Sequence, residues 1–504
     1  MTITSLEEYT KIFTQSTSLE VKAHGEVYTP LKLVTEMLDK LPPHVWSDPN
    51  LKWFEPACGL APFLYMSYQR LMAGLADIIP DVVVRRRHIL EQMFFFNEIQ
   101  PKNITLVKLL FNSSCYKLNL FEGDAFKLVP VDFQADIIAG NPPYNDGSGN
   151  KGKGHTLWTK FVEQSLTKWL APNGYLLFVT PSLWRQHGHQ LQTVMKSKQI
   201  LYLKIHGEKD GQQTFKCNTR YDCYLIKNVA YTEPTFIVTE RGENEVVDLR
   251  TRSFIPNHSY SLIAQLVAGE DDEKLNVLYS RSAYGADKKW VSKIRDDKHQ
   301  HPCIYTINKA NTPAFRWSSV NDRGHFGVPK VMFGGGVGYL IDAEGKYGMT
   351  QWVKAIIAPV ADLEAIKTVL ESSKFNEINK AIAVSKAELN YEILRCFRAD
   401  FWRVVPTLEM SEVVDSVGGD NDKCQAMTGS GRQCSRKGGV GGKCRQHSGC
   451  SPIGASSARA SPASSSRSGG KTVAELRNEA TAKNVKGRSK MNKAELLVVL
   501  GYQQ

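Results

Sequence analysis

The sequence predicts an α/β protein whose first half folds into a Rossmann-like, doubly wound sheet. Short, strongly apolar segments recur through the first 230 residues, and longer amphipathic segments such as "TLWTKFVEQSLTKWL" separate them. This alternation is typical of parallel strands covered on both faces by helices. We therefore expect strands within "LKWFEPA", "MFFFNEI", "ADIIAGN", "GYLLFVTP" and "DCYLIKN".

The composition changes twice beyond this first domain, residues 1–230. A mixture of Gly, aromatic and charged residues followed by helical patterns predicts a second, mixed α+β domain. After it, Ser- and Gly-rich stretches without core-forming residues predict linkers around two small modules. The expected order is a second domain at 231–410, a linker at 411–423, a Cys/His module at 424–450, a Ser-rich linker at 451–470 and a compact basic segment at 471–504.

The positive charge of the chain is concentrated at its end. The net charge is +12, and residues 417–504 contribute +10 of it, with 15 Lys and Arg against 5 Asp and Glu. A basic tail on a nearly neutral body favours a nucleic acid partner. The alternative is an extension that only increases solubility.

The chain shows no sign of a membrane segment. No apolar run approaches the ~20 residues needed to cross a bilayer, and the start "MTITSLEEYTKIF" is neither basic nor apolar. Of the ten cysteines, those in the first 400 residues are scattered, which fits a reducing compartment. We expect a soluble, intracellular protein; the oligomeric state does not follow from these features.

Chemistry-bearing residues follow the expected strands. Glu55 is followed by small residues, Glu98 ends the second strand, Asp124 follows the next, and Asn141–Tyr144 form the sequence "NPPY". In an open parallel sheet, ligands bind at the carboxyl ends of the strands, and an acidic residue there commonly accepts hydrogen bonds from ribose. Each feature alone is more often ordinary packing or a solvated side chain. Their regular order favours a nucleoside cofactor.

Four motifs, "GEVYTP", "EPACGLAPF", "GNPPY" and "APNGYLLFVTPSLW", resemble the gamma-class, TaqI-like N6-adenine DNA methyltransferases. The resemblance runs from about Gly25 to Lys227. "NPPY" alone also occurs in protein glutamine methyltransferases, whereas "VYTP" and "PACGLAPF" favour the adenine enzymes. The resemblance implies S-adenosylmethionine as cofactor and duplex DNA as partner, with cofactor contacts from Tyr28, Thr29, Pro30, Glu55, Ala57, Gly59, Glu98, Asp124 and Phe126.

Two departures from the family pattern concern this cofactor site. Ala61 and Pro62 stand where many methyltransferases have a second glycine, as in the "PAC" subgroup. The separation of Glu55 and Glu98 also exceeds a typical strand-helix-strand step, which predicts an insertion around residues 72–90.

The "NPPY" motif suits attack by a poor nucleophile. The exocyclic amine of adenine has its lone pair delocalised into the ring, and acceptors for both N–H groups would free that pair. The Asn141 side-chain oxygen and the Pro142 carbonyl are such acceptors, and Pro142 and Pro143 hold the backbone rigid. Tyr144 would stack on a flipped base, and the resemblance suggests a second aromatic residue, for which Phe215 is the candidate; an ordinary core role for Phe215 is equally compatible. Such a transfer requires alignment and neither metal nor covalent intermediate.

Two rival functions remain open. An enzyme of the same fold could methylate adenine in RNA or glutamine in a protein, although the basic tail argues against a protein substrate. Alternatively, a DNA-binding protein could carry a degenerate methyltransferase domain, although intact "NPPY" and "EPAC" sequences argue against it. No nuclease-like metal motif is recognisable.

The second domain contains candidates for reading a DNA sequence. Arg316, Trp317, Arg323 and His325 lie among aromatic residues and glycines, a mixture expected of loops that enter a groove. A generic surface loop has the same composition.

A zinc module is expected in the tail. The donors Cys424, Cys434, Cys444 and His447 make a tetrahedral set in a Gly-rich segment that has almost no core, and Cys450 is an alternative fourth ligand. The segment resembles small Cys/His modules of large DNA viruses.

The last segment resembles a SAP-type DNA-binding motif. Thr472 and Glu475 form a capping box at the start of "TVAELRNEATAKNVKGRSKMNKAELLVVL". Lys486, Arg488 and Lys490 at its turn suit phosphate contacts, which add affinity without sequence information.

Overall fold

The computed structural model describes residue 9 and residues 28–408, apart from 146–155, 335–337 and 385–388. Contacts divide the chain into two units, Met1–Ser411 and Glu412–Gln504. All described residues belong to the first unit. The predicted zinc ligands, the SAP-like segment and the Gly/Lys run that follows "NPPY" lie outside the described residues.

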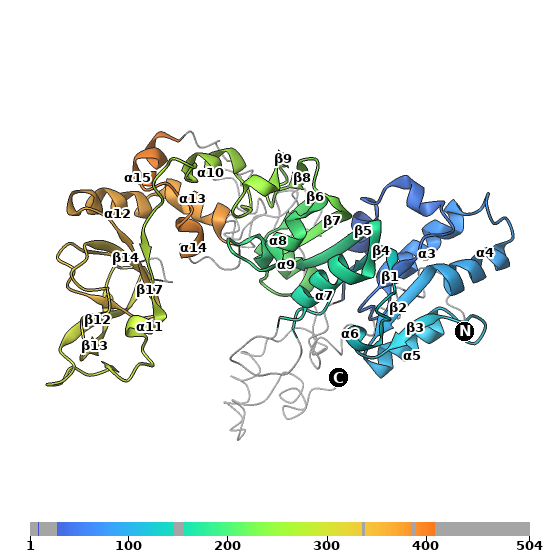
Figure 1. Ribbon diagram of the computed structural model, residues 1–504, viewed down its shortest axis with the longest axis horizontal. Coiled ribbons are helices and arrows are strands. Elements are labelled where there is room, and N and C mark those ends of the chain that lie inside the picture. The colour runs from blue at the N-terminus through green and yellow to red at the C-terminus, as the bar shows by residue number, and fades with distance from the viewer. Residues whose placement is uncertain (1–8, 10–27, 146–155, 335–337, 385–388, 409–504) are drawn as a thin grey trace, which may run out of the picture. The chain divides into compact units, whose positions relative to one another are not determined.

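Within the described residues, nine strands form one large sheet, in the order β3-β2-β1-β4-β5-β7-β6-β8-β9 (Figure 1). The first five neighbours pair in parallel, β7 is antiparallel to both β5 and β6, and β8 is again parallel to β6. The strands are β1 (Trp53–Glu55), β2 (Phe94–Glu98), β3 (Asn119–Glu122), β4 (Ala135–Gly140), β5 (Leu170–Pro181), β6 (Lys198–His206), β7 (Tyr221–Ala230), β8 (Thr235–Val238) and β9 (Asn244–Val247).

Both faces of this sheet are buried, because successive side chains of a strand point to opposite faces. Trp53 and Ile137 belong to one core, and their neighbours Phe54 and Ile138 belong to the other. The first core is covered by α2 (Leu31–Leu38), α3 (Pro62–Gly74), α5 (Pro101–Leu110) and α9 (Glu208–Phe215); the second by α6 (Ala125–Leu128), α7 (Trp158–Gln164) and α8 (Leu191–Lys196). The predicted α/β class with a doubly wound sheet is confirmed.

An additional helix lies in the segment for which the sequence predicts an insertion. Helix α4 (Val82–His88) follows α3, and a π-helical turn at Ile89–Met93 leads directly into β2. Asp81 caps α4 by accepting hydrogen bonds from the amides of Val83 and Val84, at 2.8 and 2.9 Å. Glu98 nevertheless ends β2, as expected.

The large sheet continues past residue 230, where we placed the end of the first domain. Strand β8 pairs with β6, for example Leu203 with Ile237, and β9 returns antiparallel to β8. The domain boundaries remain our proposal, with the sheet itself reaching Val247.

The remaining described residues form two four-stranded sheets and a group of helices (Figure 1). One sheet has the order β10-β17-β14-β15 and the other β11-β13-β12-β16. The strands are β10 (Val277–Leu278), β11 (Val291–Ser292), β12 (His301–Ile307), β13 (Pro313–Ser318), β14 (Lys330–Gly334), β15 (Tyr339–Asp342), β16 (Gly348–Met349) and β17 (Val353–Ile357). The helices are α10 (Tyr260–Leu266), α11 (Arg281–Tyr284), α12 (Leu363–Glu371), α13 (Ser373–Ile382), α14 (Tyr391–Leu394) and α15 (Phe401–Val404).

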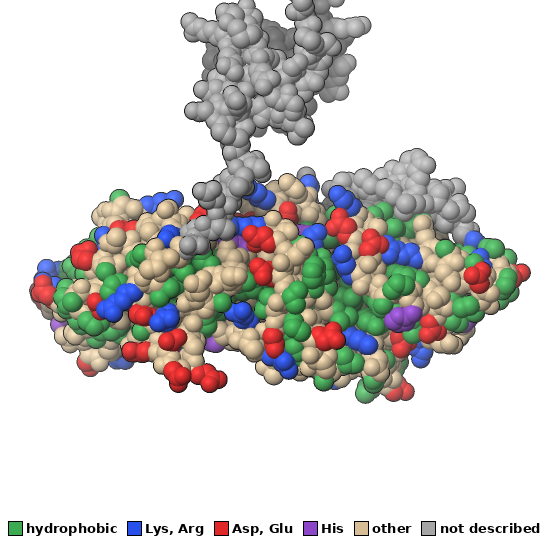
Figure 2. All heavy atoms as spheres, turned by 90° about the horizontal axis from the view of Figure 1, so that it is seen from above, with side chains coloured by type: hydrophobic (Ala, Val, Ile, Leu, Met, Phe, Trp, Pro, Cys, Tyr) green, Lys and Arg blue, Asp and Glu red, His purple; other side chains and the backbone are tan. Residues whose placement is uncertain are grey.

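The surface is mixed in charge. On the face shown in Figure 2, Lys and Arg side chains of the described residues are interspersed with Asp and Glu. This agrees with the small net charge of residues 1–416, which have 48 Lys and Arg against 46 Asp and Glu. None of the helices built from described residues has the length and hydropathy needed to cross a bilayer.

Candidate active site

The expected site residues meet at the carboxyl edge of the sheet, because β1 to β4 run parallel. Strands β1 and β4 pair side by side, and Gly140 at the end of β4 directly precedes "NPPY". A Cβ built on Gly140 would lie 3.8 Å from Cγ of Glu55 and 3.9 Å from Cδ of Pro56. Gly140, the residue before "NPPY", therefore lies next to the side chains of Glu55 and Pro56.

Glu98 organises the neighbouring loop. One carboxylate oxygen accepts a hydrogen bond from the amide of Gly59, at 2.7 Å, and the other accepts from the amides of Ile99 and Gln100, at 2.9 and 2.7 Å. The residue is only 5% exposed. Because charge-assisted bonds to backbone amides are strong, this carboxylate fixes the position of the loop after β1 relative to β2.

Asn97 connects the next loop and was not singled out from the sequence. Its amide nitrogen donates to the carbonyls of Phe121, at 2.9 Å, and Gly123, at 3.1 Å. In addition, the amide of Cys58 donates to the carbonyl of Asn97 at 2.9 Å. The side chain thus ties the end of β2 to the end of β3, and the backbone carbonyl ties it to the loop after β1. No sequence signal marks it, since its partners lie more than 20 residues away.

Glu55 is a buried carboxyl group at the end of β1. It is 1% exposed, and one oxygen accepts a hydrogen bond from the amide of Leu64 at 3.1 Å. Burial raises the pKa of Glu55 well above 4.5; the Leu64 and Phe63 amides oppose this shift, and the nearby Glu98 adds to it. Tyr9 lies close by and donates its hydroxyl to the carbonyl of Leu60, at 2.9 Å.

Tyr28, the first described residue of the "VYTP" motif, lies near the same loop. Gly59 has the left-handed φ of +55°, and a Cβ there would lie 3.9 Å from Cε1 of Tyr28. Thr29 is buried, and the carbonyl of Pro30 accepts from the amide of Val34 in the first turn of α2. The structure therefore brings Tyr28 to the loop that contains Gly59, with Thr29 and Pro30 next to it in the chain.

Asp124 and Phe126 lie at the end of β3. Asp124 caps α6 by accepting from the amide of Phe126 at 3.1 Å. The ring of Phe126 packs against Phe161 and Trp169, with centroids 4.8 and 5.7 Å apart. Ala57 is half-buried against the same core.

The "NPPY" residues follow β4 directly. Pro142 and the side-chain oxygen of Asn141 are buried, whereas Pro143 is exposed. Tyr144 is partly exposed, but its hydroxyl is buried, and burial raises the pKa of Tyr144 well above 10.0, with Cys223 and Cys217 contributing.

Phe215, the candidate second aromatic residue, ends α9. It is 8% exposed, and its ring packs edge-on against Tyr221, 4.8 Å away. Tyr221 also contributes to the pKa of Tyr144. Phe215 is thus close to the "NPPY" end of the sheet but is packed in the core.

The four candidates for reading DNA in the second domain fall into two groups. The guanidinium groups of Arg316 and Arg323 stack on the rings of Tyr305 and Trp290, each 3.9 Å from the centroid. Trp317 is half-buried and carries the guanidinium of Arg295 at 4.9 Å.

His325, in contrast, is 1% exposed, and its Nδ1 accepts from the amide of Met349 at 3.1 Å. Burial lowers the pKa of His325 to about 4, and the charge of Lys330 adds to this effect. The expectation that His325 contacts a groove is wrong, because a buried, neutral imidazole with a backbone partner is a structural residue.

Metal ligands are not grouped in this part of the protein. In residues 28–408, with the gaps given above, no three His, Cys, Asp or Glu side chains cluster as a metal site would require.

Comparison with known proteins finds sequence similarity in part of the chain. A family model described as "Eco57I restriction-modification methylase" matches residues 91–211, which include β2 to β6 and the "NPPY" motif. An uncharacterized adenine-specific methylase of Mycoplasma pneumoniae is 42% identical over 75 residues. The aligned segment spans 14% of this chain and 18% of that relative.

Solved structures show weaker similarity. A nuclease-deletion mutant of the Type ISP restriction-modification enzyme LlaGI, in complex with a DNA substrate mimic, is 10% identical with a TM-score of 0.48, covering 80% of this chain and 48% of that chain. The Type IIL restriction-modification enzyme MmeI, in complex with DNA, is 12% identical with a TM-score of 0.40, covering 77% and 67%. The sequence similarity to a restriction-modification methylase family is therefore local, to residues 91–211.

Proposed function

We propose that this protein is an S-adenosylmethionine-dependent DNA methyltransferase that modifies N6 of adenine. The observation that carries the proposal is the "NPPY" motif at the carboxyl end of β4, where the preceding Gly140 lies next to the side chains of Glu55 and Pro56. The local match of residues 91–211 to a methylase family supports it.

In this proposal, the side-chain oxygen of Asn141 and the carbonyl of Pro142 accept hydrogen bonds from the two N–H groups of the adenine amine. Hydrogen bonding at both hydrogens draws the lone pair of the nitrogen out of conjugation with the ring, so that it can attack. The two prolines fix φ, and the acceptors need little reorganisation during the reaction. Tyr144, partly exposed beside them, stacks on the flipped base.

The residues at the ends of β1 to β3 fit the cofactor. Gly59 adopts a conformation that favours glycine, and among the described residues outside its chain neighbours the Tyr28 ring alone comes within 4 Å of a Cβ built there. Glu98 is fixed by three backbone amides beside that space, where a carboxylate can accept from a ribose hydroxyl. When bound, S-adenosylmethionine supplies a methyl group on a sulfonium sulfur.

The second domain and the tail contact DNA in this proposal. Residues 281–323 have nine Lys and Arg against four Asp, in a first unit whose total charge is near zero. Arginines stacked on aromatic rings, as at Arg316 and Arg323, present rigid planar donors for bases or phosphates. The zinc module and the SAP-like segment of the tail remain predictions from the sequence.

The test is to express the protein in a methylation-deficient bacterium and to map N6-methyladenine along its DNA. We expect one modified sequence motif that is lost in Asn141→Ala and retained in the matched control Asn145→Ala, an exposed asparagine four residues away. A motif that survives Asn141→Ala would exclude this site. Methylation of RNA oligonucleotides or of protein instead of DNA would favour a rival of the same fold, and no methylation would favour a DNA-binding protein with a degenerate domain.

A further inference from the structure

A fully buried ion pair lies beside the candidate site. Arg185 and Asp222 are both 0% exposed, and Nε of Arg185 lies 2.9 Å from Oδ2 of Asp222. Ser182 donates its hydroxyl to the other carboxylate oxygen at 2.8 Å. Charged groups are rarely removed from water completely unless each of their donors and acceptors finds a partner.

The remaining donors of Arg185 reach the segment that leads into the second domain. Nη1 donates to the carbonyl of Ile255, and Nη2 donates to Oδ1 of Asn257, both at 2.9 Å. In return, the amide of Ile255 donates to the carbonyl of Arg185 at 3.0 Å. The guanidinium thus holds residues 255–257 against the large sheet.

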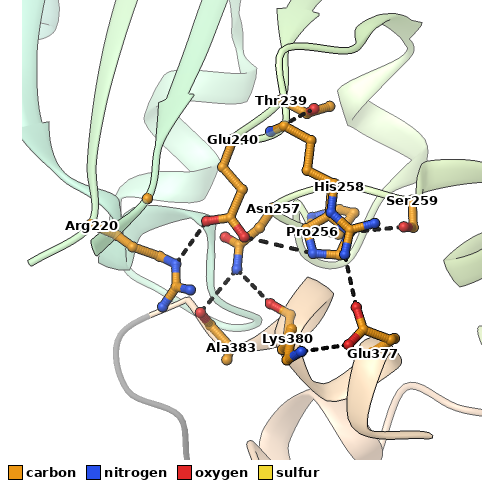
Figure 3. A network of polar contacts seen from close by, with 12 residues as sticks. Arg220, Thr239, Glu240, Pro256, Asn257, His258, Ser259, Glu377, Lys380 and Ala383 are labelled. Carbon is orange, nitrogen blue, oxygen red and sulfur yellow. Dashed lines mark hydrogen bonds and ion pairs between the residues drawn. The ribbon is translucent and has the colours of Figure 1, made fainter. Parts of the chain in front are cut away.

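Asn257 extends this connection to α13. It is 0% exposed, and its Nδ2 donates to the carbonyls of Lys380, at 2.9 Å, and Ala383, at 3.0 Å. Its backbone amide donates to the carbonyl of Ala381 at 2.7 Å. Figure 3 shows the two side-chain bonds of Asn257 to the end of this helix. One side chain therefore satisfies carbonyls at the C-terminal end of α13, which the helix itself leaves unsatisfied.

An outer layer of charges surrounds Asn257 (Figure 3). Arg220 pairs with Glu208 and Glu240, at 2.9 and 3.1 Å, and Arg241 pairs with Glu377 of α13 at 2.9 Å. These groups are partly exposed and are therefore screened by salt, whereas the inner connection through Arg185 is not.

The position of the inner connection suggests its role. Ser182 and Arg185 directly follow β5, and Asp222 is the second residue of β7, whose start pairs with the end of β5 at Pro181. Strand β5 neighbours β4, with Phe178 opposite Gly140, so the connection lies at the same edge of the sheet as "NPPY".

Resting on the proposed function, we propose that Arg185, Asp222 and Asn257 are positioning residues that hold α13, and with it the second domain, in register with the adenine pocket. A hydrophobic contact between the large sheet and α13 would have no directional preference. The five hydrogen bonds around Arg185 and Asn257 are directional, so they favour one orientation of α13 relative to the sheet. A DNA bound by the second domain then presents its target base at a fixed distance from Asn141.

The test uses the full-length chain with Asn257→Ala, which keeps the Arg185–Asp222 pair and the backbone bond to Ala381 but removes the side-chain bonds to Lys380 and Ala383. The matched control is Asn228→Ala, because Asn228 also bridges two backbone carbonyls, those of Leu170 and Ala171, each at 3.0 Å, but at the opposite edge of the same sheet. Hydrogen exchange by mass spectrometry reports on residues 255–266 and 373–383. Steady-state methylation of a DNA containing the mapped motif gives kcat and KM, and calorimetry gives the affinity for S-adenosylhomocysteine.

We expect faster exchange in both segments of Asn257→Ala and a loss of kcat/KM for DNA of roughly tenfold or more, because small misplacements of a reacting group are costly. Affinity for S-adenosylhomocysteine stays at the wild-type value, and Asn228→Ala leaves kcat/KM unchanged. Unaltered exchange, or faster exchange with unaltered kcat/KM, overturns the inference, as does an equal loss of cofactor affinity. A wild-type chain that does not methylate DNA overturns the proposed function and with it the positioning role; the exchange measurement still decides whether Asn257 holds α13.

Discussion

Glu55 illustrates how burial at one residue links the candidate site to stability. Its pKa is raised well above 4.5, chiefly by desolvation. Between the ordinary pKa and the raised one, the folded state binds a proton that the unfolded state has released, so stability falls as pH rises. Because an amide does not ionise and can still accept from Leu64, Glu55→Gln removes this dependence.

We therefore expect wild type and Glu55→Gln to be similar in stability near pH 4.5 and to diverge above it. The variant becomes the more stable by up to about 1.4 kcal/mol per pH unit until the raised pKa is reached. Urea denaturation from about pH 5 to about pH 8 measures this difference. A difference that does not grow with pH would contradict the assignment.

The contribution of Glu98 to cofactor binding can be tested with a control at the residue paired with it on the neighbouring strand. Glu98 pairs with Glu122 of β3, which is exposed and forms an ion pair with Lys108. Glu98→Gln removes the carboxylate that accepts from the ribose hydroxyl in the proposed function, at an expected cost of about 1.5–3 kcal/mol in binding S-adenosylhomocysteine, or roughly tenfold or more in Kd.

Glu122→Gln is the control, and its affinity stays at the wild-type value because exposed ion pairs contribute little. Calorimetric titration of both variants gives the comparison. Equal losses in the two variants would show that the carboxylate of Glu98 has no special role.

At the scale of elements, α9 depends on one glycine. A Cβ at Gly211 would lie 2.1 Å from the carbonyl oxygen of Thr219 and 2.9 Å from that of Cys217, both backbone atoms. Gly211→Ala therefore forces α9 away from residues 217–219, which lead into β7. We expect a loss of about 1–3 kcal/mol in the free energy of unfolding.

The matched control is Gly269→Ala, where the added Cβ makes an ordinary contact of 3.4 Å with Asp272. It should change stability by no more than about 0.5 kcal/mol. Urea denaturation measures the free energy of unfolding of both variants. Similar values for the two would contradict the close packing of α9.

Five of the strands of the large sheet lie where the apolar pattern of the sequence predicts them. The apolar segments around Phe54, Phe95, Ile138, Phe178 and Tyr224 are β1, β2, β4, β5 and β7, as predicted. A strand was expected before Asp124, but its residues were not identified, because β3 has four residues and none of them is fully buried. Strands β8 and β9 were assigned to the second domain, since their membership of the sheet depends on pairing with β6.

At the scale of the whole molecule, the basic tail should change how DNA binding responds to salt. Residues 417–504 carry +10 of the net charge of +12. Each phosphate neutralised by the protein contributes about −0.9 to the slope of log K against log salt concentration. A chain ending at Ser411, the last residue of the first unit, should bind DNA more weakly and with a shallower slope than the full chain.

Fluorescence anisotropy with a labelled duplex at several salt concentrations measures both slopes. The truncated chain should retain the methylated motif and the affinity for S-adenosylhomocysteine, because its active-site residues all precede residue 411. Parallel salt plots for the two chains would exclude a role of the tail in contacting phosphates.

The sequence by itself determined the sheet class and the strand ends that carry the candidate residues, because both follow from local patterns. Apolar runs mark strands, and parallel strands bring Glu55, Glu98, Asp124 and Asn141 to one edge. Tertiary structure alone decided which partners meet there, such as Glu98 with the amide of Gly59, 39 residues away, and Asn257 with Ala383, 126 residues away. It also decided that His325 is buried. Such partners are set by packing between distant segments, and neither spacing nor periodicity encodes them.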